Sequence, residues 1–284
     1  MAQFTNQAQL SYNNSVVNSN VVVGEILEAA SAAKTAISTT YTRGGDVAYA
    51  ISIVNTGGSA LTNVTVTDDL GAYADGTETR TPLTYREGSV RLFVNGVLQP
   101  APTVTAGPPL TVSGITLPAG GDLVLLYETD VNAFAPLGTD GSIVNTATVT
   151  GSGIPTPIIV TETVTPVAEP SLAITKSLEP VPVTENGRLT YRFVIENFGN
   201  TEAVATDNVS LSDQFEPILT DLAVDLDGVT WTEGTEYNYD ETTGQFTTVP
   251  GQITVPAATY TQNEQSGEWT VIPGVTVLTV TGTV

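Results

Sequence analysis

Cysteine and histidine are both absent from this 284-residue sequence. Without them the chain cannot form a disulfide, a zinc site built from the usual ligands, or a Ser-His-Asp or Cys-His catalytic pair. Most familiar hydrolase mechanisms are thereby excluded. A glycosidase-like pair of carboxylates is the one route left, and no such pair stands out among the acidic residues. We therefore expect no enzyme activity, no cofactor and no small-molecule substrate.

Basic residues are scarce, with eight Lys and Arg against 30 Asp and Glu and a formal net charge of −22. A charge of this sign repels phosphate backbones and anionic lipid surfaces, so we expect no nucleic-acid partner. Long apolar runs are missing too: nothing approaches the ~20 residues of a transmembrane helix, and the first residues lack the pattern of a secretory signal. We expect no membrane insertion and no visible export signal.

Acidic residues in predicted loops have two interpretations. Their carboxylates suit Ca²⁺, but their spacing matches no known calcium loop. Solvated surface charge is the simpler interpretation, and we expect no metal site. The residues concerned are Asp221, Asp225, Asp227, Asp240 and Glu241.

Short alternating runs of Val, Thr, Ile and Tyr, broken by 26 Gly and 17 Pro, fill the sequence. Alternation with a period of two is typical of half-buried strands, and Gly and Pro mark turns. The length suits two domains of roughly 100–150 residues each. We predict an all-β protein with two domains.

An internal repeat supports the two-domain prediction. Residues 33–57 align with residues 175–199 at a constant offset of 142 (34 to 176, 49 to 191), and Val64–Asp68 aligns with Val209–Asp213. The two halves therefore represent one duplicated fold. We predict a first repeat domain at residues 28–168 and a second at residues 169–284.

The repeat carries recurring motifs: a Lys in the first strand, Tyr-x-Ile-x-Ile-x-Asn-x-Gly from Tyr49, Val-Thr-Val-Thr-Asp ending at Asp68, Leu-Pro-Ala-Gly from Leu117, and Ile-Val-Asn-Thr-Ala-Thr-Val from Ile143. In these motifs the chain resembles a conserved repeat domain of unknown function from bacterial and archaeal surface proteins. The resemblance implies an immunoglobulin-like β-sandwich used in cell-surface arrays and stalks, and a location outside the cell. It implies no activity.

The second repeat departs from this pattern because it lacks the last two strands. The first repeat has Ile143–Thr150 and Ile158–Val164 at its end, whereas the second stops at the preceding strand, Val277–Val284. Two segments at the start of the chain, Phe4–Ser11 and Asn20–Ile26, resemble the missing strands in order and spacing. Any two strands rich in Thr and Val share some likeness, but the matching absence favours displacement. We predict an N-terminal donor segment, residues 1–27, with donor-strand residues Phe4, Asn6, Ala8, Leu10, Val21, Val23 and Ile26.

A sandwich without two strands exposes an unpaired sheet edge that recruits a strand from elsewhere. Donation from one copy to the next is heterologous, so it repeats into an open filament. The logic resembles that of donor-strand pilins. We therefore expect the second domain to be completed in trans by another copy of the chain. The chain would then be the structural subunit of a pilus or spore-appendage filament, and its partner would be a further copy of itself. The alternative is an adhesin or surface-layer stalk module that binds a host or cell-surface ligand.

Lysine, a carboxylic acid and asparagine follow one another in each repeat. This order resembles the self-forming isopeptide bonds of Gram-positive adhesins and pilins, in which a neutral Lys attacks an Asn amide beside a protonated carboxyl. The resemblance implies a bond between Lys34 and Asn145 assisted by Asp68. It also implies a bond between Lys176 and Asn6 of a neighbour, assisted by Asp213. The alternative is that each Lys is salt-bridged or snorkelling and each Asn a strand-end residue.

Overall fold

The computed structural model describes residues 2–26 and 30–284. The all-β prediction is confirmed, because the described residues form strands and a single short 3-10 helix, η1 (Ala205–Asp207). The chain divides into unit 1, Met1–Pro136 with Ser142–Thr165, and unit 2, Leu137–Gly141 with Pro166–Val284. The predicted boundary between residues 27 and 28 lies outside the described residues.

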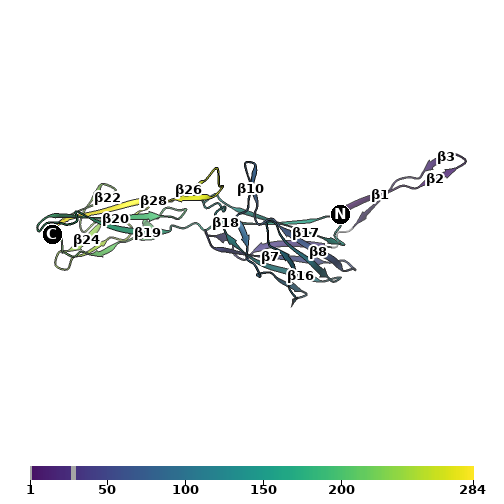
Figure 1. The fold of residues 1–284 in the computed structure, drawn as a ribbon, viewed down its shortest axis with the longest axis horizontal. Helices are drawn as coiled ribbons and strands as arrows, with labels where there is room; N and C mark the ends of the chain where they lie inside the picture. The colour runs from purple at the N-terminus through teal and green to yellow at the C-terminus, as the bar shows by residue number, and fades with distance from the viewer. Residues whose placement is uncertain (1, 27–29) are drawn as a thin grey trace. The chain divides into compact units, whose positions relative to one another are not determined.

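The N-terminal segment is a narrow antiparallel ribbon, purple in Figure 1, in which β1 pairs with β4 and β2 pairs with β3. Its turn is Asn13-Asn14, with φ angles of 42° and 59°, a conformation that Asn adopts readily and that suits a two-residue hairpin. The two strands expected from sequence are therefore four shorter ones. Their bounds are β1 (Ala2–Asn6), β2 (Gln9–Tyr12), β3 (Ser15–Asn18) and β4 (Val22–Ile26).

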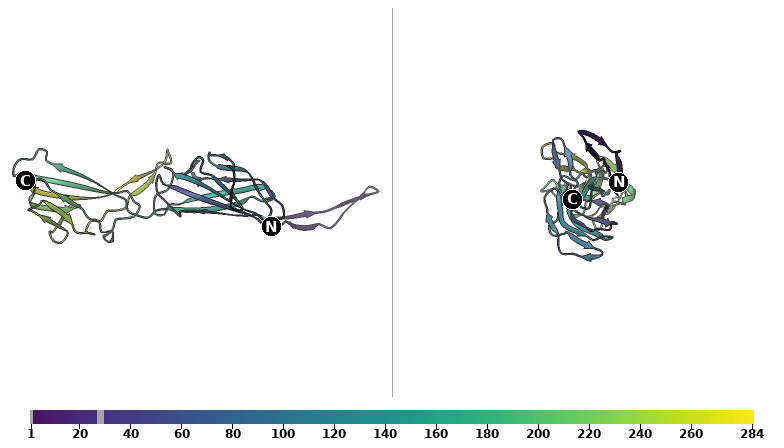
Figure 2. Two further views of the ribbon diagram at one scale, coloured as in Figure 1. Left: turned by 90° about the horizontal axis from the view of Figure 1, so that it is seen from below. Right: turned by 90° about the vertical axis from the view of Figure 1, so that its right-hand side faces the viewer.

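Two six-stranded sheets form the sandwich of unit 1 (Figures 1 and 2). The first has the order β13-β12-β16-β7-β5, with β11 also paired to β16, and the second has the order β14-β15-β8-β17-β18-β6. The strands of the first sheet are β5 (Ala30–Ala36), β7 (Asp46–Asn55), β11 (Leu83–Tyr85), β12 (Arg91–Val94), β13 (Val97–Leu98) and β16 (Asp122–Val131). Those of the second are β6 (Thr40–Tyr41), β8 (Leu61–Asp68), β14 (Thr103–Thr105), β15 (Leu110–Leu117), β17 (Ile143–Ser152) and β18 (Ile158–Pro166). A separate hairpin joins β9 (Tyr73–Asp75) to β10 (Glu78–Arg80).

Alternating residues of the central strands build the core of unit 1. Along β7 and β16 every second side chain is buried, as expected for strands with one face against a core. Tyr49 and Tyr127 face each other across these two strands, and their rings stack with centroids 5.6 Å apart. Both tyrosines contact the polar cluster described below: the Lys34 amine lies over the Tyr49 ring, and the Tyr127 hydroxyl is hydrogen-bonded to Asp68.

Unit 2 repeats this plan with fewer strands. One sheet has the order β19-β20-β28-β22-β23 and the other has the order β21-β25-β24. The larger sheet comprises β19 (Leu172–Glu179), β20 (Arg188–Asn197), β22 (Thr220–Leu226), β23 (Val229–Trp231) and β28 (Gly274–Thr283). The smaller comprises β21 (Ser212–Gln214), β24 (Tyr237–Asp240) and β25 (Gln245–Thr248), and a hairpin joins β26 (Thr259–Gln262) to β27 (Trp269–Ile272).

Equivalent residues make equivalent contacts in the two units. Lys34 pairs across the first two strands with Ile51 in unit 1, and Lys176 pairs with Phe193 at the same register in unit 2. Asn55 and Asn197 close the same turn: the Nδ2 of Asn55 donates to the carbonyl of Ser59 at 2.9 Å and that of Asn197 to the carbonyl of Thr201 at 2.8 Å. The two units are therefore copies of one fold at the level of single side chains.

Candidate functional site

A cluster of polar side chains lies in the core of unit 1. Lys34 comes from β5 in the first sheet, whereas Asp68 and Asn145 come from β8 and β17 in the second. Their relative exposures are 5%, 1% and 0%. Buried charges and amides are costly unless they are paired, so a buried cluster with residues from both sheets is the strongest functional candidate in this unit.

Hydrogen bonds connect the whole cluster. The Lys34 Nζ donates to Asp68 Oδ2 at 2.6 Å, and the hydroxyl of Tyr127 donates to the same oxygen at 2.5 Å. The Nδ2 of Asn145 donates to the Tyr127 hydroxyl at 3.4 Å, and the backbone N–H of Gly71 donates to Asn145 Oδ1 at 3.2 Å. An amine, a carboxyl and an amide thus lie on one connected path.

The turn after β8 holds the carboxylate in place. Leu70 and Gly71 have φ angles of 57° and 73°, and the N–H of Leu70 donates to Asp68 Oδ1 at 3.0 Å. A Cβ on Gly71 would lie 2.5 Å from the Cγ2 of Ile143. Glycine is therefore required at this position both for the backbone conformation and for the close approach of β17.

Burial controls the electrostatics of the cluster. Desolvation lowers the pKa of the Lys34 amine, against the attraction of Asp68, and so favours the neutral nucleophilic form. Burial raises the pKa of the Tyr127 phenol well above its usual value, and the charge of Asp68 raises it further. The Lys34 amine lies 4.9 Å from the centroid of the Tyr49 ring, and burial raises the pKa of the Tyr49 phenol. The arrangement has the groups that amide exchange between Lys and Asn requires.

Unit 2 contains the same ion pair in a different environment. Lys176 on β19 and Asp213 on β21 are hydrogen-bonded, and the Lys176 amine lies 4.3 Å from the centroid of the Tyr191 ring. The side chains of Lys176 and Asp213 are 38% and 20% exposed, whereas those of Lys34 and Asp68 are 0% and 1% exposed. These two lysines are the only lysines in the sequence.

The strand pairing explains this exposure. In unit 1, β8 pairs with β15 on one side and with β17 on the other. Its counterpart β21 pairs only with β25 among the described strands, and within unit 2 no described strand takes the place of β17 or β18. Every residue of β19 is exposed as well. The edge of β21 and the inner face of β19 therefore form an open site in unit 2.

The N-terminal ribbon has the apolar residues of the predicted donor. Phe4, Leu10, Val21 and Val23 are 50%, 65%, 53% and 62% exposed, and Asn6 and Ala8 are exposed too. Ile26 ends β4, and its side chain lies outside the described residues.

The register of the ribbon differs from that of its counterpart in unit 1. Asn6 faces Val22 in the ribbon. In unit 1 the equivalent Asn145 faces Glu162, which is the counterpart of Glu25. Phe4 faces Gly24, and a Cβ on that glycine would lie 2.4 Å from the Phe4 ring. The ribbon as a free hairpin is therefore not a copy of the β17–β18 pair, and adopting that register requires a shift of one strand along the other.

The structure thus sorts the candidate residues into three groups. Lys34, Asp68 and Asn145 lie together in one cluster, Lys176 and Asp213 form an ion pair, and Asn6 lies on the exposed ribbon. Sequence reasoning missed Tyr127 and Gly71. The available signal for Tyr127 was its place in an alternating strand, opposite Tyr49.

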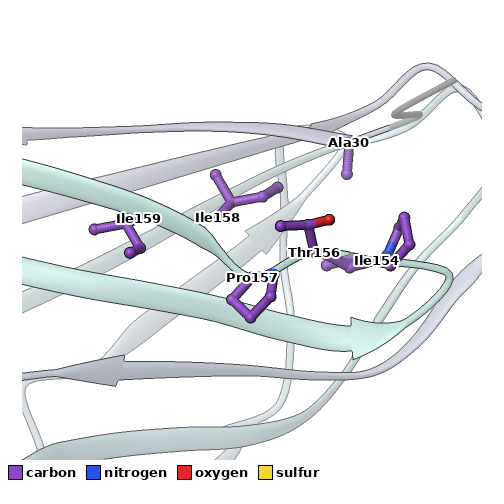
Figure 3. Close-up of a pocket in the computed structure, with 7 residues that line it drawn as sticks. Ala30, Ile154, Thr156, Pro157, Ile158 and Ile159 are labelled. Carbon is purple, nitrogen blue, oxygen red and sulfur yellow. The ribbon is translucent and has the colours of Figure 1, made fainter. Parts of the chain in front are cut away.

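A pocket of about 240 Å³ lies elsewhere in unit 1, at the loop between β17 and β18 (Figure 3). Its lining is mainly apolar and has no ionisable side chain, so it offers no catalytic group. It is lined by Ala30, Ile154, Pro155, Thr156, Pro157, Ile158 and Ile159. Among the described residues there is no group of three or more side chains that could hold a metal ion, and no helix long and apolar enough to cross a membrane.

No protein-family model matches the sequence, and no curated protein matches it. Among solved structures, the chain is similar to the major pilin subunit BcpA of Bacillus cereus in its D312A variant, with 12% identity, a TM-score of 0.40, and coverage of 95% of this chain and 73% of that one. It is also similar to the pilus backbone RrgB of Streptococcus pneumoniae, with 13% identity, a TM-score of 0.35 and coverage of 86% of this chain. The match spans 55% of the pneumococcal protein. A collagen-binding domain from a Staphylococcus aureus adhesin matches half of this chain, with 13% identity and a TM-score of 0.29.

Proposed function

We propose that the chain is the structural, non-catalytic subunit of an extracellular or spore-surface filament of the pilus type. Copies join head to tail when the N-terminal segment of one chain completes unit 2 of the next. The observation that carries the proposal is the contrast between two copies of one ion pair, 0% exposed at Lys34 and 38% exposed at Lys176. The same fold is closed in unit 1 and open in unit 2.

The open edge defines what would fill it. In unit 1, Ala147 and Val149 of β17 face Asp68 and Val66 of β8, and both are fully buried. Their counterparts in the N-terminal segment are Ala8 and Leu10, which would lie along β21. Backbone hydrogen bonds to the unpaired edge and burial of Phe4, Leu10 and Val23 would drive this association.

Two covalent bonds would form, one within each subunit and one between neighbouring subunits. In each, the neutral Lys Nζ attacks the Asn Cγ, the new Nζ–Cγ bond replaces the Cγ–Nδ2 bond, and ammonia leaves after one proton has passed from Nζ to Nδ2. Lys34 would bond to Asn145 within a subunit, beside Asp68. Lys176 would bond to Asn6 of the neighbour, beside Asp213, once the donated strand has buried the pair.

Deletion of residues 1–24 tests donor-strand assembly. The truncated chain should remain as monomers or short oligomers in negative-stain images, whereas the full chain forms long fibres. Normal fibres from the truncated chain would show that strand donation is wrong. That result would favour the alternative function, a stalk or adhesin module.

A matched pair of substitutions sharpens the test. Leu10→Asp places a charge where the counterpart Val149 is fully buried, so it should block fibre growth. Gln9→Asp changes the adjacent residue, whose counterpart Thr148 is only partly buried, and should leave growth largely intact. Equal effects of the two substitutions would contradict the predicted register.

A further inference from the structure

The hydroxyl of Tyr127 has a position that the ion pair alone does not explain. It donates to Asp68 Oδ2 at 2.5 Å and accepts from Asn145 Nδ2 at 3.4 Å, so it stands between the carboxyl and the amide nitrogen. The Lys34 amine contacts the same Oδ2 at 2.6 Å. Among the hydrogen bonds of the described residues, the path from the amine to the amide nitrogen runs through Asp68 and then Tyr127.

We infer that Tyr127 is a catalytic proton relay for the bond between Lys34 and Asn145, carrying a proton from Asp68 to the departing amide nitrogen. The inference rests on the isopeptide bond of the proposed function. It adds a residue and a direction of proton transfer to that reaction.

The direction of proton transfer follows from a reversal of the hydrogen bonds that join Asp68, Tyr127 and Asn145. While Asp68 is ionised, the phenol donates to it. When Asp68 takes a proton from the Lys34 ammonium, the carboxyl becomes the donor to the phenol. Once attack at Cγ has given Nδ2 a free lone pair, the phenol hydrogen turns toward Nδ2. Burial keeps the phenol protonated, since its pKa is raised well above the usual value. The phenol therefore has a proton to give throughout the reaction.

Each proton in the step is accounted for. Neutral Lys34 attacks Cγ of Asn145, and the N–H of Gly71, 3.2 Å from Oδ1 in the resting state, stabilises the oxygen as negative charge develops. Tyr127 gives its proton to Nδ2 and takes the proton of Asp68. The Cγ–Nδ2 bond breaks and ammonia leaves. Asp68 regains a proton from Nζ, so the phenol ends unchanged and the carboxyl ends protonated, one proton richer than in the resting ion pair.

Unit 2 provides a natural contrast. Tyr127 pairs with Tyr49 across β16 and β7, and at the same place in unit 2 Val280 pairs with Tyr191. Val280 is fully buried and has no hydroxyl. The relay is thus confined to unit 1, and the bond between subunits has to form without it. We expect the bond within unit 1 to form faster.

The test measures how quickly the full-length chain closes its own bond. The chain is made in a cell-free reaction, quenched at intervals and digested, and the linked Lys34–Asn145 peptide is quantified by mass spectrometry. Tyr127→Phe keeps the ring and loses the hydroxyl, and its rate should fall on the order of a hundredfold, within the usual range of general acid–base catalysis. A rate equal to that of the wild type would overturn the relay and leave the bond itself standing.

Two controls separate chemistry from structure. Tyr73→Phe removes a phenol that donates to the Phe134 carbonyl at 2.8 Å in the same unit, and it should leave the rate unchanged. Fluorotyrosines at position 127 make the phenol more acidic with little change of size, and the rate should follow that acidity. A slow Tyr127→Phe variant together with no response to fluorination would reduce Tyr127 to a positioning residue. Absence of the linked peptide in the wild type would overturn the cross-link and the relay together.

Discussion

Lys34 and Lys176 occupy the same position in two copies of one fold, and each forms an ion pair with the carboxylate at the end of the next repeated motif, Asp68 or Asp213. The side chain of the first is 0% exposed and that of the second 38% exposed. The difference arises from the pairing of β8 with β17, which has no equivalent at β21 among the strands that the structure describes. One chain therefore contains both the closed and the open form of the same site.

Removal of each lysine should affect stability very differently in the unassembled chain. Lys34→Ala leaves Asp68 buried without its partner, which costs about 3–5 kcal/mol. Lys176→Ala breaks a partly exposed pair and should cost about 1 kcal/mol or less. Urea unfolding of both variants measures the difference, with Asn145→Ala included to separate loss of the ion pair from loss of the cross-link. Similar costs for the two lysines would contradict the proposed difference in environment.

The stability of the Asn145→Ala variant should rise with pH, because its Lys34 cannot react and remains titratable. Burial lowers the pKa of the folded-state amine below the ordinary 10.5. Between the folded pKa and 10.5, the unfolded chain therefore binds more protons, so stability increases with pH across that window and is level below it. Urea unfolding at stepped pH checks this.

The control for the pH experiment is the double variant Asn145→Ala with Lys34→Met. It retains the tyrosines, so the comparison cancels their ionisation. The rise should vanish in the double variant. A fall in stability with pH that depends on Lys34 would contradict the lowered pKa.

Chemical acetylation should distinguish the two lysines and report assembly. In the free chain Lys176 should react and Lys34 should not, since their side chains are 38% and 0% exposed. In filaments both should be protected, because the donated strand covers Lys176. Peptide mass spectrometry measures each site, with the terminal amine as an internal standard. A Lys176 that stays reactive in intact fibres would argue against strand insertion at β21.

Boiling in SDS should leave a ladder of covalent oligomers from mature fibres. Each bond expels one ammonia, so the mass falls by roughly 17 Da per link, as amide exchange requires. Lys176→Ala and Asn6→Ala should each abolish the ladder, whereas Lys34→Ala should retain it. A monomer band from wild-type fibres would leave them held by strand pairing alone.

Much of the polar cluster of unit 1 could be predicted from the sequence, because the fold is duplicated within the chain. The constant offset identified Lys34 with Lys176, and the structure gives both the same cross-strand register, opposite Ile51 and Phe193. Asp68 and Asn145 were predicted from motif order, and both lie in the cluster. The alternation of apolar and polar residues was sufficient to place these residues, because each of them lies on a regular strand.

Tyr127 could not be assigned from sequence because its role depends on geometry between sheets. Alternation places it on the inner face of its strand, but only the packing of β16 against β8 and β17 brings its hydroxyl to Asp68 and Asn145. The division of the N-terminal segment into four short, mutually paired strands was not predicted, for a local reason. Asn13-Asn14 forms a tight turn, and the hydrogen bond from the Ser19 N–H to the Ala8 carbonyl bridges a break between two short pairs of strands.

The scarcity of lysine has a consequence for how long such a protein survives among proteases. Trypsin-like enzymes cut only after Lys or Arg, and neither residue occurs between Arg91 and Lys176 or after Arg192. Lys34 is buried, and Lys176 would become buried as soon as a neighbouring strand lies over it. Amide formation at both would remove the positive charge that such enzymes recognise. The side chains placed to link the chain are thus also two of its few tryptic cleavage sites, and linking them would remove both.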